Sequence, residues 1–227
     1  MRTPMSIAPD RSALLLVDFQ EEQRVVPEYA VEGFGGIVER ARRLLHAARE
    51  HGLLVLHCAF RRDYALRPPR PFEPRAEDGS AIFSDRSSPF TAICAEVAPL
   101  QGEHVTWKND ASAFCEGDVA PLLKAACIEW LIVCGVWTEA CVAATVRDAM
   151  AAGLRVLLVK DACGSGTSAM HQTGVLNLAN RLYGGAVANT ERTLRLMAGE
   201  TADAWIAQRP VPILFRREDW ESHYDRL

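Results

Sequence analysis

The chain has 227 residues, of which 49% are hydrophobic and 24% are charged, the composition of one ordinary globular domain. Its formal net charge of -4 gives no general attraction to polyanions, which excludes nucleic acid and acidic membrane surfaces as main partners. A small molecule is therefore the expected ligand.

The cysteine content and the N-terminal region indicate a cytoplasmic protein with reduced thiols. The seven cysteines are an odd number and form no CxxC pair, which argues against a disulfide framework and against a thiolate zinc site. Near the N-terminus the only apolar run is Ala13 to Val17, which is too short for a signal peptide or a membrane span.

Strand and helix patterns alternate along the chain. Strongly apolar segments typical of buried parallel strands cover residues 12–19, 52–60, 129–137 and 153–162, and weaker strand patterns cover 103–108 and 185–190. Helical patterns cover residues 35–51, 139–152 and 168–184. This alternation predicts right-handed βαβ units and an α/β fold, a doubly wound three-layer α/β/α structure with a six-stranded parallel sheet.

Two segments fall outside the alternation. Residues 61–90 are rich in Pro, Arg and Asp and have no sustained periodicity, which predicts a long loop within the domain. Residues 200–227 carry Trp205 and Trp220 and are predicted to form an extension that docks on the same or a neighbouring subunit. The predicted organisation is thus a domain over residues 1–199 followed by this extension.

Three chemically useful side chains follow predicted strands. Asp18 follows the first strand, Lys108 ends the "HVTWK" segment, and Cys141 lies where a helix begins after "LIVCGVW". In an open parallel sheet, ligands bind outside the carboxyl ends of the strands. An acid, a cation and a thiol are therefore expected at one edge of the sheet.

These residue types together predict nucleophilic catalysis. A helix N-terminus and the Lys108 ammonium are expected to lower the pKa of the Cys141 thiol and to stabilise its thiolate. The Asp18 carboxylate would take the thiol proton and pass it to a leaving nitrogen. Backbone N–H groups of the turn before Cys141 would bind the oxyanion of a tetrahedral intermediate.

Three segments, in this order along the chain, carry a family resemblance: "LLLVDFQ", "WKNDASAF" and "LIVCGVWTEACVAATVRDAMAAGLRVLLVKDAC". They resemble the signature blocks of the isochorismatase-like cysteine hydrolases. This superfamily includes nicotinamidase, N-carbamoylsarcosine amidohydrolase, ureidoacrylate amidohydrolase and biuret hydrolase. The resemblance extends from about Ser12 to Thr193, which is most of the chain.

The resemblance implies a catalytic triad of Asp18 as base, Lys108 as the cation that stabilises the thiolate, and Cys141 as nucleophile. It also implies a cis peptide bond between Val136 and Trp137, with the N–H groups of Trp137 and Cys141 forming the oxyanion hole. The family fold is the same six-stranded doubly wound sheet. Its members are oligomers, so a homodimer or homotetramer without a cofactor is expected.

This sequence differs from two groups of family members, and both differences limit the reaction that is expected. Nicotinamidases have a metal-binding Asp-x-His and a second His after the second strand, whereas this region of the chain has no His after His57. No metal is therefore expected. Siderophore-pathway isochorismatases lack the cysteine that this chain has. The resemblance thus favours hydrolysis of a C–N bond in a small amide, carbamoyl or ureido compound through a thioester, with release of ammonia or an amine.

Substrate contacts are less constrained by the sequence. Trp137 is predicted to form a wall of the pocket, although a large aromatic in this turn can also pack beneath the edge of the sheet. Arg61 and Arg62 are the candidates for binding a substrate carboxylate, against the alternative of a solvated charged loop. For Phe114, a pocket wall and core packing are equally compatible with the sequence.

Three alternatives remain open at this level. One is a nicotinamidase-like hydrolase of ring amides. Another is a nucleotide-binding domain that uses the glycine-rich turn at residues 164–166, although this turn has neither GxGxxG nor a Walker lysine. The last is a non-catalytic oligomeric interaction protein that uses its aromatic C-terminal segment.

Overall fold

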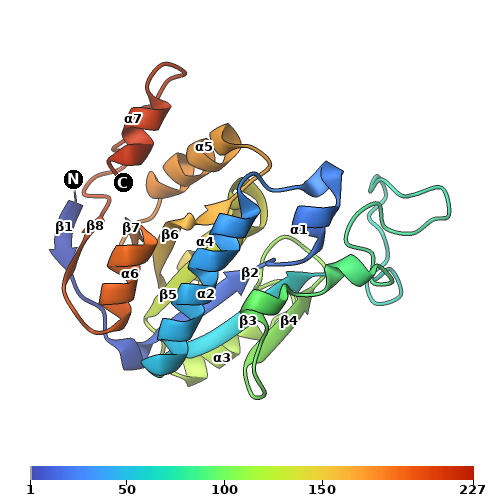
Figure 1. Ribbon diagram of the computed structural model, residues 1–227, viewed down its shortest axis with the longest axis horizontal. Helices are drawn as coiled ribbons and strands as arrows, with labels where there is room; N and C mark the ends of the chain where they lie inside the picture. Colours follow the sequence, from blue (N-terminus) through green and yellow to red (C-terminus); the bar gives the residue numbers. More distant parts are fainter. Residues whose placement is uncertain (1) are drawn as a thin grey trace.

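A central β-sheet lies between two layers of helices (Figure 1). The computed structural model describes residues 2–227. The strands are β1 (Arg2–Met5), β2 (Ser12–Val17), β3 (Leu54–Phe60), β4 (His104–Lys108), β5 (Trp130–Val136), β6 (Arg155–Gly164), β7 (Ala186–Ala188) and β8 (Ala202–Trp205). The helices are α1 (Glu22–Val25), α2 (Phe34–Glu50), α3 (Val119–Ala125), α4 (Ala143–Ala151), α5 (Ser168–Ala179), α6 (Thr190–Met197) and α7 (Trp220–Asp225).

The sheet confirms the predicted doubly wound topology. Its order is β1-β8-β7-β6-β5-β2-β3-β4, and all pairs from β7 to β4 are parallel. The chain runs outward from β2 to β4 on one side and from β5 to β7 on the other. Strands β2 and β5 therefore flank the point where the strand order reverses, which is where such folds bind ligands.

Two antiparallel strands enlarge the predicted six-stranded sheet to eight. Strand β8 pairs with β7, and β1 pairs with β8, so the two ends of the described chain lie together at one edge of the sheet. The sequence did not indicate these strands because each has only four residues, β1 contains Pro4, and neither contains an apolar run.

The buried strands divide their side chains between two cores. In β2, Leu14 and Leu16 pack in the cluster that includes α2 and α6, whereas Leu15 and Val17 pack in the cluster that includes α3, α4 and α5. Every residue of β2 is buried. This two-sided burial explains the continuous apolar run in the sequence, because a strand covered on both faces has no solvent side to alternate with.

The predicted helices form with shifted ends. Helix α2 agrees with its prediction within one residue at each end. The segment predicted as a helix from residue 139 begins instead with a π-type turn, Thr138–Val142, and continues as α4. Helix α5 ends at Ala179 rather than at residue 184. The next residue, Asn180, holds the backbone of Ile213 through two side-chain hydrogen bonds.

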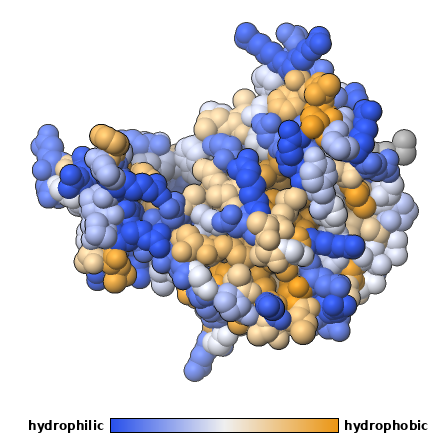
Figure 2. Space-filling view, turned by 180° about the vertical axis from the view of Figure 1, so that it is seen from behind, coloured by the Kyte–Doolittle hydropathy of each residue, from blue (hydrophilic) through white to orange (hydrophobic). Residues whose placement is uncertain are grey.

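The predicted long loop projects from the sheet edge beyond β3 and β4 (Figure 1). Residues 61–88 form neither helix nor strand and contain only isolated bridges, one of which joins Arg62 to Asp85. Seen from behind, the loop protrudes at the left and carries both hydrophilic and hydrophobic residues (Figure 2). The Phe72 side chain is 99% exposed.

The C-terminal segment packs against its own chain. Besides β8, it contributes α7, which lies on α5, where Trp220 Nε1 donates a hydrogen bond of 3.1 Å to Gln172. The division of the chain at residue 199 stays a prediction, and β8 from beyond it is part of the sheet. No helix within residues 2–227 combines the length and the apolar character that crossing a bilayer requires.

Candidate active site

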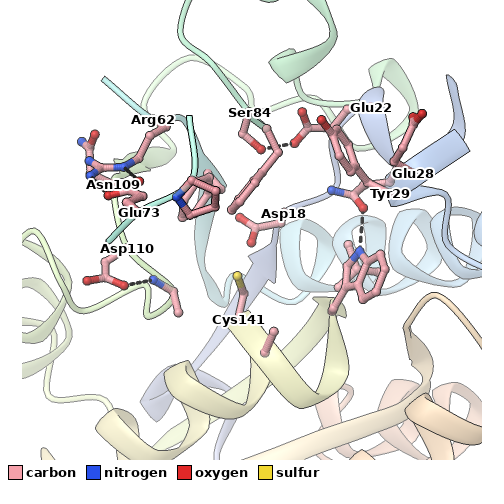
Figure 3. A pocket seen from close by; sticks show the side chains of 18 of the residues that line it. Asp18, Glu22, Glu28, Tyr29, Arg62, Glu73, Ser84, Asn109, Asp110 and Cys141 are labelled. Atoms are coloured by element: carbon pink, nitrogen blue, oxygen red, sulfur yellow. Dashed lines mark hydrogen bonds and ion pairs between the residues drawn. The ribbon is translucent and has the colours of Figure 1, made fainter. Parts of the chain in front are cut away.

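The carboxyl ends of three strands bring together Asp18, Lys108 and Cys141. Asp18 directly follows β2, Lys108 is the last residue of β4, and Cys141 lies in the π-type turn after β5. Figure 3 shows the Asp18 carboxylate facing the sulfur of Cys141. The topology therefore places the three predicted residues in one site.

Asp18 and Lys108 form a buried ion pair. Lys108 Nζ lies 2.9 Å from Asp18 Oδ2, and the two side chains are 0% and 4% exposed. Lys108 Nζ also lies 4.7 Å from the centre of the Phe60 ring. Asp18 adopts a left-handed backbone conformation, with φ of 54°, which is uncommon outside glycine. Within residues 2–227 its other carboxylate oxygen, Oδ1, has no hydrogen-bond partner.

Burial and mutual attraction shift the pKa values of this pair. Burial raises the pKa of Asp18, and Lys108 only partly opposes it. Burial disfavours the charged form of Lys108, but the negative groups Asp18 and Cys141 outweigh this and raise the pKa of Lys108. Lys108 therefore stays cationic, and Asp18 is a stronger base than an exposed carboxylate.

The expected lowering of the Cys141 pKa is wrong for this arrangement. Burial raises the pKa of the Cys141 thiol to about 12, the Asp18 carboxylate raises it as well, and Lys108 opposes them without cancelling their effect. Sequence reasoning counted the nearby cation and the helix start but had no measure of desolvation. The resting site thus holds a protonated thiol beside a buried carboxylate.

The peptide bond between Val136 and Trp137 is cis, as the family resemblance predicted. Gly135, directly before it, has φ of 142°, and a Cβ atom there would lie 2.1 Å from the Val17 carbonyl oxygen. Only glycine therefore fits where β5 meets β2 at this point. The Trp137 carbonyl accepts hydrogen bonds from the N–H groups of Ala140 and Val142, which close the turn around the cysteine.

A polar network links the turn to the C-terminal segment. Thr138 Oγ1 donates a hydrogen bond of 3.0 Å to the Gly164 carbonyl and lies 2.8 Å from Nδ1 of His171. Nε2 of His171 lies 3.0 Å from the hydroxyl of Tyr224 in α7. Burial, with a smaller effect of Lys160, lowers the pKa of His171 to about 4. This histidine is therefore neutral and holds the turn through hydrogen bonds.

A cavity of about 820 Å³ opens above the cysteine. Trp137 lines it, and its indole N–H donates a hydrogen bond of 2.8 Å to Gln23 Oε1. A Cβ atom at Gly166 would come within 2.8 Å of the indole ring, so the ring lies directly against this glycine. The orientation of the Trp137 wall is thus fixed from two sides.

The other predicted substrate contacts lie in different places. Arg62 lines the cavity, but its guanidinium forms two hydrogen bonds of 2.7 Å with Glu73. Arg61 points elsewhere, because its guanidinium carbon lies 4.0 Å from the centre of the Trp107 ring. Phe114 packs against the core on the side of α3, α4 and α5. Arg61 and Phe114 are therefore corrected to packing roles.

Sequence reasoning missed Glu22, Ser84 and Gln23 in the cavity wall. Glu22 and Gln23 stand four and five residues after Asp18 in "DFQEEQ", and α1 turns them back toward the site. That spacing was the available signal for these two residues. Ser84 comes from the irregular loop, where the sequence offered no periodicity.

One group of potential metal ligands occurs within residues 2–227, and it comprises Glu21, Cys94 and Glu96. The side chain of Arg24 donates hydrogen bonds to both carboxylates. The group is therefore held together as an ion-pair cluster. It lies outside the residues that line the cavity above Cys141.

The doubly wound sheet carries a cysteine near the point where its strand order reverses. This arrangement defines an α/β protein whose ligand site contains a cysteine. Residues 12–192 match the family model described as the isochorismatase domain, and the chain belongs to this family.

Known relatives agree with this assignment. Maleamate amidohydrolase from Pseudomonas putida is 32% identical over 201 residues, which cover 83% of this chain and 89% of that protein. Ureidoacrylate amidohydrolase from Variovorax paradoxus is 26% identical over 219 residues, covering 88% and 86%. A crystal structure of a cysteine hydrolase from Pseudomonas syringae pv. phaseolicola has a TM-score of 0.75 at 21% identity, covering 86% of this chain and 95% of that one.

Proposed function

We propose that the protein is a cysteine-dependent amidohydrolase that cleaves the C–N bond of a small amide, carbamoyl or ureido compound. The names of the relatives, maleamate amidohydrolase and ureidoacrylate amidohydrolase, support hydrolysis of small amides. The observation that carries the proposal is the buried Asp18–Lys108 pair with the partly buried Cys141 at the floor of the cavity. A thiol beside a general base and a cation is an arrangement that activates sulfur for acyl transfer.

Proton transfer and attack are coupled in the proposed first step. Because the Cys141 thiol is protonated at rest, it attacks the amide carbonyl carbon as its proton moves to Asp18 Oδ1, the oxygen without a partner. Asp18 then gives this proton to the leaving nitrogen as the C–N bond breaks, which leaves a thioester and releases ammonia or an amine. Lys108 keeps its charge and stabilises the sulfur as negative charge develops on it.

Water completes the cycle. Asp18 takes a proton from a water molecule that attacks the thioester carbonyl, and returns it to the sulfur as the C–S bond breaks. The products are the free thiol and a carboxylic acid, or a carbamic acid when the substrate is a carbamoyl or ureido compound. We assign the backbone N–H groups of Trp137 and Cys141 as the donors to both tetrahedral oxyanions, because both belong to the turn that carries the nucleophile.

Acyl-enzyme trapping tests the proposal. A panel of amides, carbamoyl and ureido compounds is scored for ammonia release, and the enzyme is quenched in acid during turnover and weighed by intact mass spectrometry. We expect an acyl adduct on Cys141 and a loss of at least about 1,000-fold in kcat for Cys141→Ala. Cys127→Ser, which changes an exposed thiol, serves as the matched control and should keep full activity.

Turnover of any panel compound by Cys141→Ala at the wild-type rate would refute the proposal. Ammonia release without a metal supplement distinguishes it from a nicotinamidase-like, metal-assisted reaction. Thermal protection by mononucleotides or dinucleotides would instead favour the nucleotide-binding alternative. Assembly into a dimer or tetramer remains a prediction, to be measured by light scattering.

A further inference from the structure

The wall of the cavity carries more carboxyl groups than cations. Two arginines and five acidic residues line it: Arg62 and Arg70, and Asp18, Glu22, Glu28, Glu73 and Asp110. The lysine of the catalytic group lies beneath the cavity and is bonded to Asp18. A substrate that enters this cavity therefore meets an excess of negative charge.

Both lining arginines already have acidic partners. Arg62 forms a two-pronged ion pair with Glu73, with both contacts at 2.7 Å, and its side chain is 6% exposed. Arg70 is bonded to Asp110. Among the described residues that line the cavity, no cation is left to bind a substrate carboxylate.

Glu22 is the buried carboxyl group that remains without a cation. The residue is 2% exposed, and the Ser84 hydroxyl donates a hydrogen bond of 2.5 Å to its Oε1. Ser84 is held in a left-handed conformation, with φ of 51°, and its carbonyl accepts a hydrogen bond from the backbone of Arg62. Burial raises the pKa of Glu22 to about 7, with a further contribution from the charge of Asp18. Figure 3 shows Glu22 and Ser84 across the cavity from Cys141.

Aromatic side chains line the same cavity as Glu22. Phe60 stacks on Phe83 with ring centres 5.5 Å apart, and Tyr29 meets Phe83 edge-on at 6.2 Å. Trp137 adds the fixed indole wall. Aromatic faces beside a buried carboxylate attract cationic and N–H-bearing groups and give an anion no compensating partner.

We propose that Glu22 determines specificity. The cavity takes amides whose remaining part is aromatic or apolar and is either uncharged or ended by an ammonium group, and it rejects amides that carry a carboxylate. This substrate class rests on the proposed amidohydrolase function. A carboxylate in this cavity would lose its hydration and lie beside Glu22 and Asp18, and such unpaired charge is an effective means of rejection.

The test uses three matched benzamides that differ only in the para substituent: aminomethyl, hydroxymethyl or carboxylate. Ammonia release by the wild-type enzyme gives kcat/KM, and calorimetric titration of Cys141→Ala gives affinity without turnover. We expect the aminomethyl compound to equal or exceed the neutral one and to exceed the carboxylate by at least about tenfold in both measurements.

The two measurements separate the two proposals. If binding follows this order but no compound is hydrolysed by the wild-type enzyme, the reaction assignment fails and the specificity stands. If the carboxylate compound binds or reacts as well as the neutral one, the specificity fails and the reaction stands. Absence of binding by all three compounds at millimolar concentration also overturns the specificity.

Substitutions of carboxylates test whether Glu22 is the residue that sets the specificity. Glu22→Gln should lower the affinity for the aminomethyl compound about tenfold and reduce the discrimination against the carboxylate. Glu77→Gln is the control, because Glu77 is an exposed carboxylate of the loop that does not line the cavity, and it should change affinity less than about twofold. Glu22→Asp keeps the charge and should keep the order of preference. An unchanged order in a folded Glu22→Gln variant would overturn the assignment.

Discussion

The turn after β5 and the loop after β3 line the same cavity in opposite ways. The turn is short, and its flanking residues Thr138 and Val142 are fully buried. The loop over residues 61–88 has no regular structure, and ion pairs such as Arg62–Glu73 hold it. We infer from this difference that the chemistry depends on core-anchored residues at the strand ends, among them the turn with Cys141. Substrate selection depends on the loop and on Glu22, which accepts a hydrogen bond from Ser84 of the loop.

The largest effect is expected at the base of the catalytic group. Asp18→Asn preserves the shape of the side chain but cannot take the thiol proton, so kcat should fall by roughly 100- to 10,000-fold. Steady-state ammonia release measures this effect. Asp63→Asn, which changes a buried loop carboxylate, is the control and should lose far less activity. Equal losses in the two variants would remove the distinction between strand ends and loop.

Stability should depend strongly on the same pair. Lys108→Met leaves the buried Asp18 carboxylate without its cation, which should lower the free energy of unfolding by about 3–5 kcal/mol. Adding Asp18→Asn should recover part of this loss, because the unpaired charge is then gone. Urea denaturation measures both variants, and Lys124→Met, at an exposed position, is the control. A purely additive double variant would contradict the coupling.

A smaller and different effect is expected in the loop. Arg62→Ala removes the two contacts with Glu73 and should raise KM about tenfold while kcat changes less than about twofold. Arg86→Ala is the control in the same loop, because the Arg86 side chain is 61% exposed. A fall in kcat with unchanged KM would assign the loop to the chemistry instead.

A pH-dependent change in stability is expected at Glu22. Burial raises the pKa of Glu22 from its ordinary 4.5 to about 7, so in this range the folded protein binds more protons than the unfolded chain. Its stability contribution is present below about pH 4.5 and is lost as the pH rises through about 7. The Tm of Glu22→Gln relative to wild type should therefore increase between about pH 5 and pH 8. A constant difference would contradict the shift.

The sequence allowed the sheet, the cis bond and the grouping of Asp18, Lys108 and Cys141 to be predicted. Asp18 and Lys108 directly follow or end a strand, and Cys141 lies in the turn that follows β5, so the strand pattern assigns all three to one edge of the sheet. The sequence did not indicate that the pKa of Cys141 is raised, because desolvation depends on what surrounds the sulfur in three dimensions. The Arg62–Glu73 pair was equally out of reach, since nothing periodic relates two residues in an irregular loop.

The hydrogen bonds that link Thr138, His171 and Tyr224 behind the turn have defined donors and acceptors. Since the Thr138 hydroxyl gives its proton to the Gly164 carbonyl, Nδ1 of His171 must supply the proton shared with Thr138. Nε2 of the neutral ring is then bare, and the Tyr224 hydroxyl must donate to it. The Tyr224 hydroxyl in α7 thereby selects one tautomer of His171. Tyr224→Phe would remove the hydrogen bond that selects this tautomer. A change remote in sequence would therefore loosen the backbone that presents the nucleophile.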